Sequence, residues 1–358
     1  MHGEYKVPGG KLVVVDLEVD DGTLTEVVVS GDFFLEPDEA LPLVAEALVG
    51  LPHDAAVSRL VEAIGSRLER AQADGTLPGP VAMVGFDAHA VAVATRRALG
   101  FSTAWADHTF ELIHPGPLPP AMHTALDQVL TDELAAGRRG PTLRFWEWVE
   151  PAVVIGSFQS LRNEVDLEAA ERYDVTVVRR ISGGGAMFME AGNCITFSLV
   201  VPTSLVDGMS FEESYGFLNQ WVLGALEDVG VHAFLAGLND IASPDGKLAG
   251  SAQKRVVGGA VLHHVTMSYD IDAAKMLEVL RIGREKLSDK GTTSAVKRVD
   301  PVRSQTHLPR EAVIEAFKAH FRSRYATVDG ELRAEELQQA AHLMETKFTD
   351  PTWTARVP

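Results

Sequence analysis

One stretch decides the fold: Arg179-Arg180-Ile181-Ser182-Gly183-Gly184-Gly185-Ala186-Met187-Phe188. A strand-like run brings two arginines to three consecutive glycines, and an apolar strand then resumes. Glycines leave backbone N–H groups uncovered because they have no Cβ, so a phosphate or carboxylate can approach closely. The spacing matches neither the phosphate loop that ends in Gly-Lys-Ser/Thr nor the dinucleotide pattern Gly-x-Gly-x-x-Gly. Taken alone, the same composition is also typical of a flexible hairpin turn between solvated arginines.

A second informative stretch begins at Asn239-Asp240-Ile241 and continues with DGKLAGSAQ, residues 245–253. The dipeptide Asp245-Gly246 is typical of a turn, so Lys247 is predicted to begin a strand of small residues. Small side chains let a ligand lie against the backbone, where the ammonium of Lys247 can stabilise charge on a phosphate or carboxylate oxygen. A lysine beside a hairpin turn is more often simply exposed to solvent.

Histidine and cysteine give weaker indications. His263 and His264 are adjacent in an apolar strand pattern, so their side chains face opposite sides and do not easily chelate one metal ion. One of the two could line a pocket. Cys194 is the single cysteine of the chain, and it lies in a strand-like run where a small buried thiol is ordinary. Nothing in the sequence supplies this thiol with a base, so Cys194 is predicted to be structural.

Length and composition exclude several classes of protein. The chain has 358 residues, of which 46% are hydrophobic and 23% charged, as expected for a globular protein of two domains. No apolar run approaches the roughly 18 residues that a membrane helix needs, and the N-terminus has no signal-peptide core. We therefore expect a cytoplasmic protein with no membrane partner. A single cysteine excludes a disulfide framework and a cysteine-rich zinc site.

The charge is acidic and unevenly distributed. A formal net charge of −18 argues against a nucleic-acid partner, which requires a basic surface. Residues 1–100 carry 7 basic and 16 acidic side chains, whereas residues 178–303 carry 13 and 14. An anionic ligand is therefore expected in the middle of the chain.

A proline-rich segment predicts a boundary between two domains. The segment PGPLPP at residues 115–120 follows a small α+β pattern with a hairpin at Asp21-Gly22, so residues 1–104 and 105–358 are predicted to be separate domains. Strands and helices in mixed order favour an α+β second domain with a largely antiparallel sheet. The expected strands of the second domain are 142–148, 152–157, 175–179, 194–201, 248–255 and 259–271. The expected helices of the chain are 38–49, 54–73, 87–99, 121–136, 164–173, 210–229, 272–281, 310–327 and 333–347.

Together, these motifs resemble the lipoate–protein ligase family, part of the wider biotin/lipoyl ligase and octanoyltransferase superfamily. The similar segments occur in the family's order: Phe110–Ile113, Ala125–Asp127, Gly156–Gln159, Arg179–Gly185, Gly192-Asn193, Asn239-Asp240, Lys247–Gln253, Gly259–His264 and Lys290–Ser294. The resemblance implies a biotin/lipoyl-ligase-like catalytic domain over residues 105–358, with a central mixed, largely antiparallel sheet packed by helices.

The resemblance also implies the site residues. Lys247 is the implied catalytic residue, and Asp240 is an implied ligand of Mg²⁺. The implied ATP- and lipoyl-AMP-binding positions are Arg180, Gly183, Gly184, Gly185, Ala186, Met187, Phe188 and Lys247. Further acyl or nucleotide contacts are expected at Asn193, His263 and Thr266. Met189-Glu190 stands where many relatives have His-Asp, which leaves the acyl-chain contacts open.

The activity implied by the resemblance is ATP-dependent lipoate–protein ligation. ATP, with Mg²⁺, converts lipoate (or octanoate) to acyl-AMP, and the acyl group then passes to a lysine of a lipoyl domain. The expected acceptors are the E2 subunits of 2-oxoacid dehydrogenases or the glycine cleavage H protein.

Residues 1–104 resemble the family's accessory domain through Pro8–Leu12, Asp21-Gly22 and Ser30–Phe34. In the best-known ligases this module follows the catalytic domain or is a separate chain, whereas here it comes first.

Three alternatives remain at this point. An octanoyltransferase would take its acyl group from an acyl carrier protein through an enzyme cysteine. Related transferases place that cysteine shortly before, or well after, the position of Lys247, and neither residues 231–238 nor the chain after His264 contain one. A non-catalytic protein that binds lipoate or lipoyl domains is a second alternative, and biotin ligation is a third.

Overall fold

The computed structural model describes residues 1–7, 9–281 and 301–358. Two compact units make up the chain: Met1–Ala104 with Ser204–Ser210, and Trp105–Thr203 with Phe211–Pro358. Residues 204–210, which we had assigned to the second domain, belong to the first unit, where Asp207 Oδ2 lies 2.9 Å from Arg96 Nε. Pro8 and Lys290–Ser294 of the motifs above lie outside the described residues.

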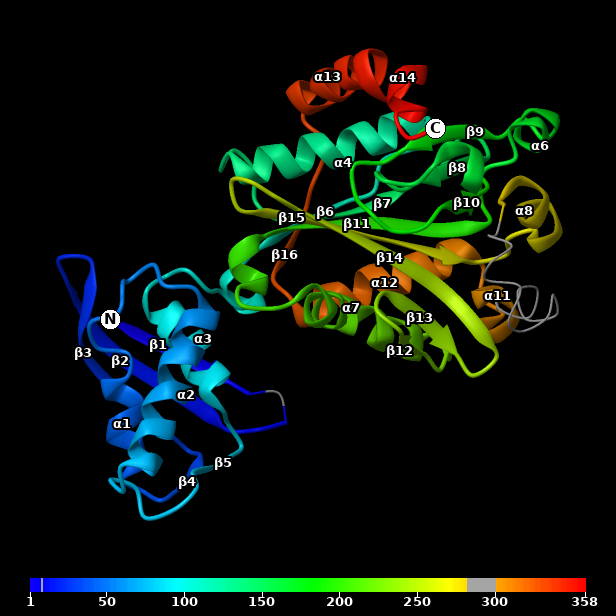
Figure 1. Cartoon of the computed structure of the whole chain (residues 1–358). Helices are drawn as coiled ribbons and strands as arrows, with labels where there is room; N and C mark the ends of the chain where they lie inside the picture. The colour runs from blue at the N-terminus through cyan, green and yellow to red at the C-terminus, as the bar shows by residue number, and fades with distance from the viewer. Residues whose placement is uncertain (8, 282–300) are drawn as a thin grey trace. The chain divides into compact units, whose positions relative to one another are not determined.

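The first unit combines a small antiparallel sheet with three helices (Figure 1). Strands β1 (His2–Lys6), β2 (Leu12–Asp20) and β3 (Thr23–Gly31) pair in that order, and β2 and β3 form the hairpin expected at Asp21-Gly22. The helices lie within their predicted ranges and are α1 (Ala40–Glu46), α2 (Val57–Ala73) and α3 (Ala88–Ala98). Strand β1 and the short pair β4 (Phe34–Glu36) and β5 (Ala82–Val84) were not predicted.

The second unit is built on an eight-stranded mixed sheet in the order β12-β13-β14-β15-β11-β7-β6-β16. Its strands are β6 (Phe110–Ile113), β7 (Thr142–Trp146), β11 (Cys194–Pro202), β12 (Phe234–Ala236), β13 (Asp240–Ser243), β14 (Gly246–Val256), β15 (Ala260–Ser268) and β16 (Thr327–Asp329). Strand β6 pairs in parallel with β7 and β16, and the other pairs are antiparallel. The predicted α+β class with a largely antiparallel central sheet is confirmed.

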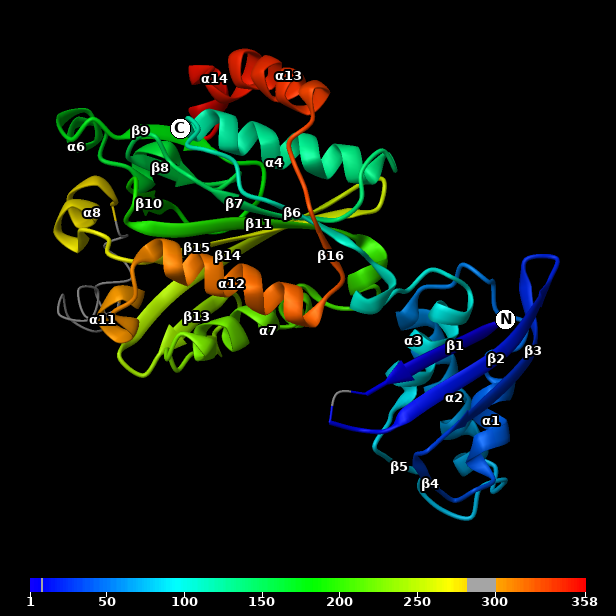
Figure 2. The ribbon, with the colours of Figure 1, turned by 180° about the vertical axis from the view of Figure 1, so that it is seen from behind.

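Helices cover both faces of this sheet (Figures 1 and 2). On one face lie α4 (Pro120–Ala135), α13 (Ala334–Leu343), the π-helical turn η3 (Met344–Phe348) and α14 (Pro351–Thr354), and on the other lie α7 (Phe211–Asp228) and α12 (Arg310–Arg324). The remaining helical segments are η1 (Trp105–Asp107), α5 (Leu161–Glu164), α6 (Leu167–Arg172), η2 (Thr203–Val206), α8 (Ala273–Val279) and α11 (Val302–Thr306).

Strand β11 is buried from Cys194 to Val201, and its sequence is mostly apolar. Alternate side chains of a strand point to opposite faces of the sheet. Phe197 packs against Trp221 of α7, with ring centroids 5.1 Å apart, while Ser198 donates a hydrogen bond to Asp127 of α4. Both faces are therefore buried, and the usual alternation of apolar and polar residues disappears.

A smaller sheet carries the glycine loop, residues 180–186. Strands β10 (Met187–Met189), β8 (Ala152–Ile155) and β9 (Thr176–Arg179) pair in that order. The glycine loop joins β9 to β10, which flank β8 on opposite sides. Among the described residues, no helix has both the length and the apolar character needed to cross a bilayer.

Candidate functional site

A pocket of about 180 Å³ brings together the two informative stretches of the sequence. Its wall includes Arg180, Gly185–Phe188, Asp240, Lys247 and Thr266. The strand β14 and the glycine loop supply opposite parts of this wall, and Ile271, Met276 and Leu280, in and beside α8, supply an apolar part. Arg180 and Lys247, which are 67 positions apart in the sequence, thus line the same pocket.

Lys247 lies at the start of β14, as the Asp245-Gly246 turn predicts. Its side chain is 44% exposed, and its ammonium lies 2.8 Å from Asp240 Oδ1. A Cβ on Gly250 would approach Lys247 Nζ to 3.3 Å, so the glycine leaves the room in which this ammonium lies. The result is a cation at the edge of the pocket, held by a carboxylate on the neighbouring strand β13.

The glycine loop is held in a conformation that requires glycine. Gly184 has a φ of +89°, and a Cβ there would lie 3.0 Å from Arg180 Nη2. Gly156, at the end of β8, approaches this loop so closely that its Cβ would lie 2.1 Å from the Gly184 carbonyl oxygen. Glycines at both positions therefore permit backbone contact that no larger residue allows.

Arg180 holds the glycine loop rather than presenting a free guanidinium. Its Nη2 donates to the carbonyl oxygens of Gly183 and Gly185 at 2.6 and 2.9 Å, and its Nη1 donates to Val154 at 3.0 Å. Burial lowers the pKa of Arg180 to about 10. Since most of its donors are used within the loop, this arginine shapes the pocket wall.

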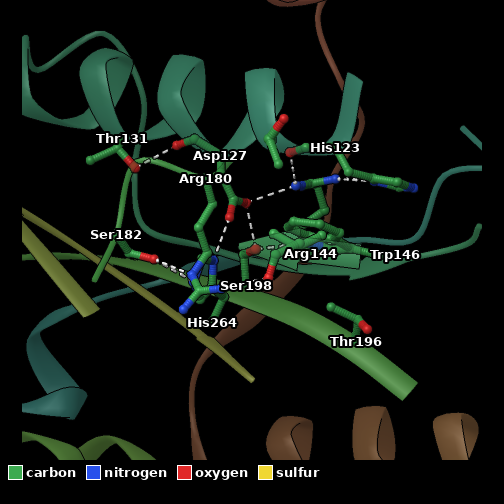
Figure 3. A network of polar contacts seen from close by, with 12 residues as sticks. His123, Asp127, Thr131, Arg144, Trp146, Arg180, Ser182, Thr196, Ser198 and His264 are labelled. Atoms are coloured by element: carbon green, nitrogen blue, oxygen red, sulfur yellow. Dashed lines mark hydrogen bonds and ion pairs between the residues drawn. The ribbon is translucent and has the colours of Figure 1, made fainter. Parts of the chain in front are cut away.

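A buried relay of side chains fixes Arg180 in turn (Figure 3). Arg180 Nε donates to Ser182 Oγ at 3.0 Å, Ser182 Oγ lies 2.7 Å from His264 Nε2, and His264 Nδ1 lies 2.8 Å from Asp127 Oδ2. Burial lowers the pKa of His264, against the opposing effect of Asp127. A neutral His264 that donates through Nδ1 accepts through Nε2, so Ser182 donates to it and accepts from Arg180.

The relay ends at Asp127, on α4. Its Oδ1 accepts hydrogen bonds from Arg144 at 2.8 Å and from Ser198 at 2.5 Å. Burial opposes its charge, but the bonds from His264 and Ser198 and the charge of Arg144 lower its pKa below the ordinary value. Asp127 is therefore a buried, ionised acceptor. Although Ser182, His264 and Asp127 are arranged as in a hydrolase triad, Ser182 lines neither the Lys247 pocket nor the small cavity beside it.

A much smaller, mostly apolar cavity of about 20 Å³ adjoins the main pocket. Trp146, Trp148, Val154 and Met189 line it, and it shares Arg180, Met187 and Thr266 with the main pocket. The two spaces therefore lie next to each other, with Lys247 in the wall of the larger one.

Cys194 lies outside these cavities. Its thiol is fully buried and donates to the Glu190 carbonyl oxygen at 3.6 Å. Burial raises its pKa to about 11. A thiol with a raised pKa remains protonated near neutral pH and is a poor nucleophile.

Two of the expected contact residues are not in the pocket. His263 faces the opposite side of the sheet, where its ring bonds to Gln253 and Asn219. The expectation that His263 contacts the ligand is therefore corrected. Because side chains alternate along a strand, its neighbour His264 takes the pocket side. Asn193 donates to the Glu190 carboxylate in the turn before β11 and lines none of the described pockets. Thr266 does line the pocket.

Glu190, which departs from the family pattern, bonds outside the pocket. Its Oε1 lies 2.8 Å from the ammonium of Lys275 on α8, and that ammonium also lies 6.0 Å from the ring centroid of Phe188. The pair connects the end of β10 to α8, which supplies part of the apolar wall of the pocket.

Ser182 and Asp127 lie in the motifs named in the sequence analysis, but the sequence assigns them no role, because nothing in a single sequence shows that they meet.

The donors around Asp240 fit a magnesium ion only in part. Mg²⁺ is commonly held by one or two carboxylates together with substrate phosphates. Asp240 is the single carboxylate of the pocket wall and is already paired with Lys247. Across residues 1–7, 9–281 and 301–358, no cluster of three or more metal-binding side chains occurs. Asp240 thus fits Mg²⁺ as a ligand shared with a bound nucleotide.

Comparison with known proteins gives relatives of two activities. Residues 119–322 match the family model described as lipoyl protein ligase A/B catalytic domain. An octanoyltransferase LipM from Halalkalibacterium halodurans is 28% identical over 60% of this chain and 86% of that protein. Lipoate–protein ligase 1 from Staphylococcus aureus is 32% identical over 57% of this chain and 56% of that protein.

A solved structure supports the same relationship. The protein described as a bi-partite lipoate protein ligase from Thermoplasma acidophilum superposes with a TM-score of 0.63 at 26% identity, and the match covers 70% of this chain and 98% of that chain. This likeness confirms the predicted biotin/lipoyl-ligase-like fold. The family model covers more than half of the sequence and includes the glycine loop and Lys247. This chain therefore belongs to the lipoyl protein ligase A/B catalytic-domain family.

Proposed function

We propose that this protein is an ATP-dependent lipoate–protein ligase. The observation that carries the proposal is the contrast between Lys247 and Cys194. The pocket presents an ammonium beside a glycine loop, whereas the single cysteine is buried, with its pKa raised to about 11. A thioester route through an enzyme cysteine needs an accessible thiolate, and this chain offers none.

The proposed reaction has two steps. A carboxylate oxygen of lipoate attacks the α-phosphorus of ATP, and pyrophosphate leaves. A lysine amine of a lipoyl domain then attacks the acyl carbon, the amine loses a proton, and AMP leaves. Each step develops negative charge on oxygens, which the ammonium of Lys247 and the loop N–H groups are suited to stabilise.

The Lys247 pocket supports a substrate with one anionic end and an aliphatic tail. Lys247 lies in its wall, and Ile271, Met276 and Leu280 supply an apolar part of the same wall. Burial of aliphatic carbon contributes about 0.8 kcal/mol per CH₂, so lipoate or octanoate gains affinity from this part. Mg²⁺ bound at Asp240 would screen the phosphates of ATP. The acceptors that we propose are lipoyl domains of E2 subunits or the H protein.

The decisive experiment compares two substitutions in the full chain. Lys247→Ala is expected to reduce lipoyl-AMP formation at least 100-fold, because removing one group that stabilises transition-state charge costs about that much. Cys194→Ala is expected to retain most activity. Pyrophosphate release with lipoate and ATP measures the first step, and mass spectrometry of an apo lipoyl domain measures the second. Thermal unfolding verifies that both variants fold.

Similarity to LipM makes octanoyl transfer the second candidate. The same assay with octanoyl-acyl carrier protein and no ATP tests it directly. Acyl transfer without ATP that disappears in a folded Cys194→Ala variant would refute the ligase proposal. Normal adenylation by Lys247→Ala would refute the role of that lysine.

A further inference from the structure

Another cavity, of about 310 Å³, contains an unbalanced group of positive charges. Lys254 reaches it from the end of β14, Lys347 from η3, and Arg356 from the chain after α14. The cavity shares no lining residue with the Lys247 pocket. We call the three cationic residues the basic cluster.

The glycine loop lies between the two cavities. A Cβ on Gly184 would lie 3.5 Å from the Ala252 Cβ, and Lys254 Nζ lies 3.3 Å from the Ile181 carbonyl oxygen. The glycine loop therefore contacts β14 at residues 252–254. Lys247 lies at the start of that strand, and Lys254, at this contact, belongs to the basic cluster. The basic cluster is a separate feature, independent of the proposed activity.

Only neutral groups accept hydrogen bonds from the basic cluster within the described residues. Lys347 Nζ donates to Gln128 Oε1 at 2.7 Å. Arg356 Nη2 donates to the hydroxyl and the carbonyl oxygen of Ser157, each at 2.5 Å. In the same part of the chain, no ion pair within 4.0 Å involves any of the three cations. Each ammonium has three donors, so donors remain for a further acceptor.

The positive charges repel one another. Burial lowers the pKa of Lys347, and the charges of Lys254 and Arg356 lower it further. Lys347 Nζ and Arg356 Cζ lie 4.2 and 4.1 Å from the ring centroid of Trp353, which brings both cations to one aromatic ring. Asp132 is the single carboxylate of the cavity wall. Three cations and one carboxylate leave an excess of two positive charges in a protein of net charge −18.

We propose that this cavity binds a small anion carrying two or more negative charges, of the pyrophosphate or phosphate-monoester type. Three cations from separate elements converge on one concave space, so a compact anion can contact all of them with charge-assisted hydrogen bonds. An extended acidic protein surface would need a broad basic face, which the acidic composition does not favour. The side chain of Phe158 at the cavity is 79% exposed and offers an apolar contact for the organic part of a monoester.

The test is calorimetric titration of the full chain with inorganic pyrophosphate and, separately, with glycerol 3-phosphate. We expect saturable binding that weakens as salt is raised, because both partners are charged. Lys347→Gln and Arg356→Gln are each expected to weaken binding at least fivefold. Arg172→Gln is the matched control: this arginine lies on α6, is 58% exposed, and pairs with Glu278. It is expected to bind as the unaltered protein does.

The choice of variants separates this site from the Lys247 pocket. Lys247→Ala is expected to retain pyrophosphate binding at the basic cluster. Binding that survives this substitution is therefore not product binding in the pocket of the proposed ligase. Stronger binding of glycerol 3-phosphate than of pyrophosphate would identify a monoester ligand, and the reverse would identify free pyrophosphate. Absence of binding, or equal binding by folded Lys347→Gln and Arg356→Gln variants, would overturn the proposal. Loss of binding in Lys247→Ala alone would assign the anion to the other pocket.

Discussion

Replacing one glycine of the loop tests whether its backbone conformation forms the binding surface. Gly184→Ala places a Cβ at a φ of +89° and 3.0 Å from Arg180 Nη2. A non-glycine residue in an unfavourable backbone region costs about 1–3 kcal/mol. Gly184 is exposed, so the loop can relieve this strain by moving away from Arg180. A ligand that binds the loop in its native conformation must then force the substituted residue back into the strained backbone conformation, and this costs binding free energy.

The expected magnitude follows from that strain. A penalty of about 1–3 kcal/mol corresponds to roughly 5- to 150-fold weaker binding. Calorimetric titration of ATP in the presence of lipoate measures it, and chemical denaturation tests whether the fold persists. We expect a change in the free energy of unfolding of less than about 1 kcal/mol, as for most exposed positions.

The same loop offers a matched control. A Cβ on Gly183 would meet no atom within 4 Å, and its φ lies outside the left-handed region. Gly183→Ala therefore adds the same methyl group without strain, and it is expected to bind ATP and lipoate more tightly than Gly184→Ala does. Equal affinities in the two variants would refute the reasoning, because the strain at Gly184 would then be unrelated to the ligand.

Three further predictions address the relay, the buried histidines and the first unit. His264→Gln cannot bond to both Ser182 and Asp127 as the imidazole does, so we expect a loss of about 1.5–3 kcal/mol in unfolding free energy, the range for hydrogen bonds to charged groups, and weaker ATP binding; a fully stable variant would contradict the relay. His263 has its pKa lowered by burial to about 3, so its unfolded form binds a proton near pH 6.5 while the folded form does not. The stabilisation is therefore complete above pH 6.5 and is lost as the pH falls. At pH 5 the free energy of unfolding, measured by urea denaturation, is expected to be lower by about 2 kcal/mol. A His263→Gln variant should show a correspondingly smaller decrease. Residues 105–358 alone are expected to transfer from synthetic lipoyl-AMP but to adenylate lipoate poorly, with residues 1–104 added as a separate chain restoring part of the first step; full adenylation by the truncated protein would show that the first unit has another role. The truncated protein keeps Asp207 but lacks its partner Arg96, so an Asp207→Asn variant of the full chain should be tested beside it.

Local pattern was sufficient for most of the elements. The spacing of Met122, Leu126, Leu130 and Leu134 predicts the helix over 121–136, which is α4, because an apolar stripe repeats every three or four residues in a helix. The Asp245-Gly246 turn likewise predicted where β14 begins. The short strands β12, β13 and β16 were missed, since three or four residues are too few to show a period. The glycine loop and Lys247 were identified through the family resemblance rather than through their chemistry alone.

Tertiary structure decided which side chains meet. Strand alternation requires His263 and His264 to face opposite sides, but only the packing of α4 and α7 on the two faces shows which one approaches Ser182. Asp127 lies 137 residues before His264, and no local pattern links residues so far apart. The basic cluster likewise comes from three separate elements. By itself, the sequence determined most of the longer elements and the family, because these depend on local patterns and motifs. The relay, the burial of Cys194 and the cavity of the basic cluster depend on sheet order and helix packing, which only the folded chain provides.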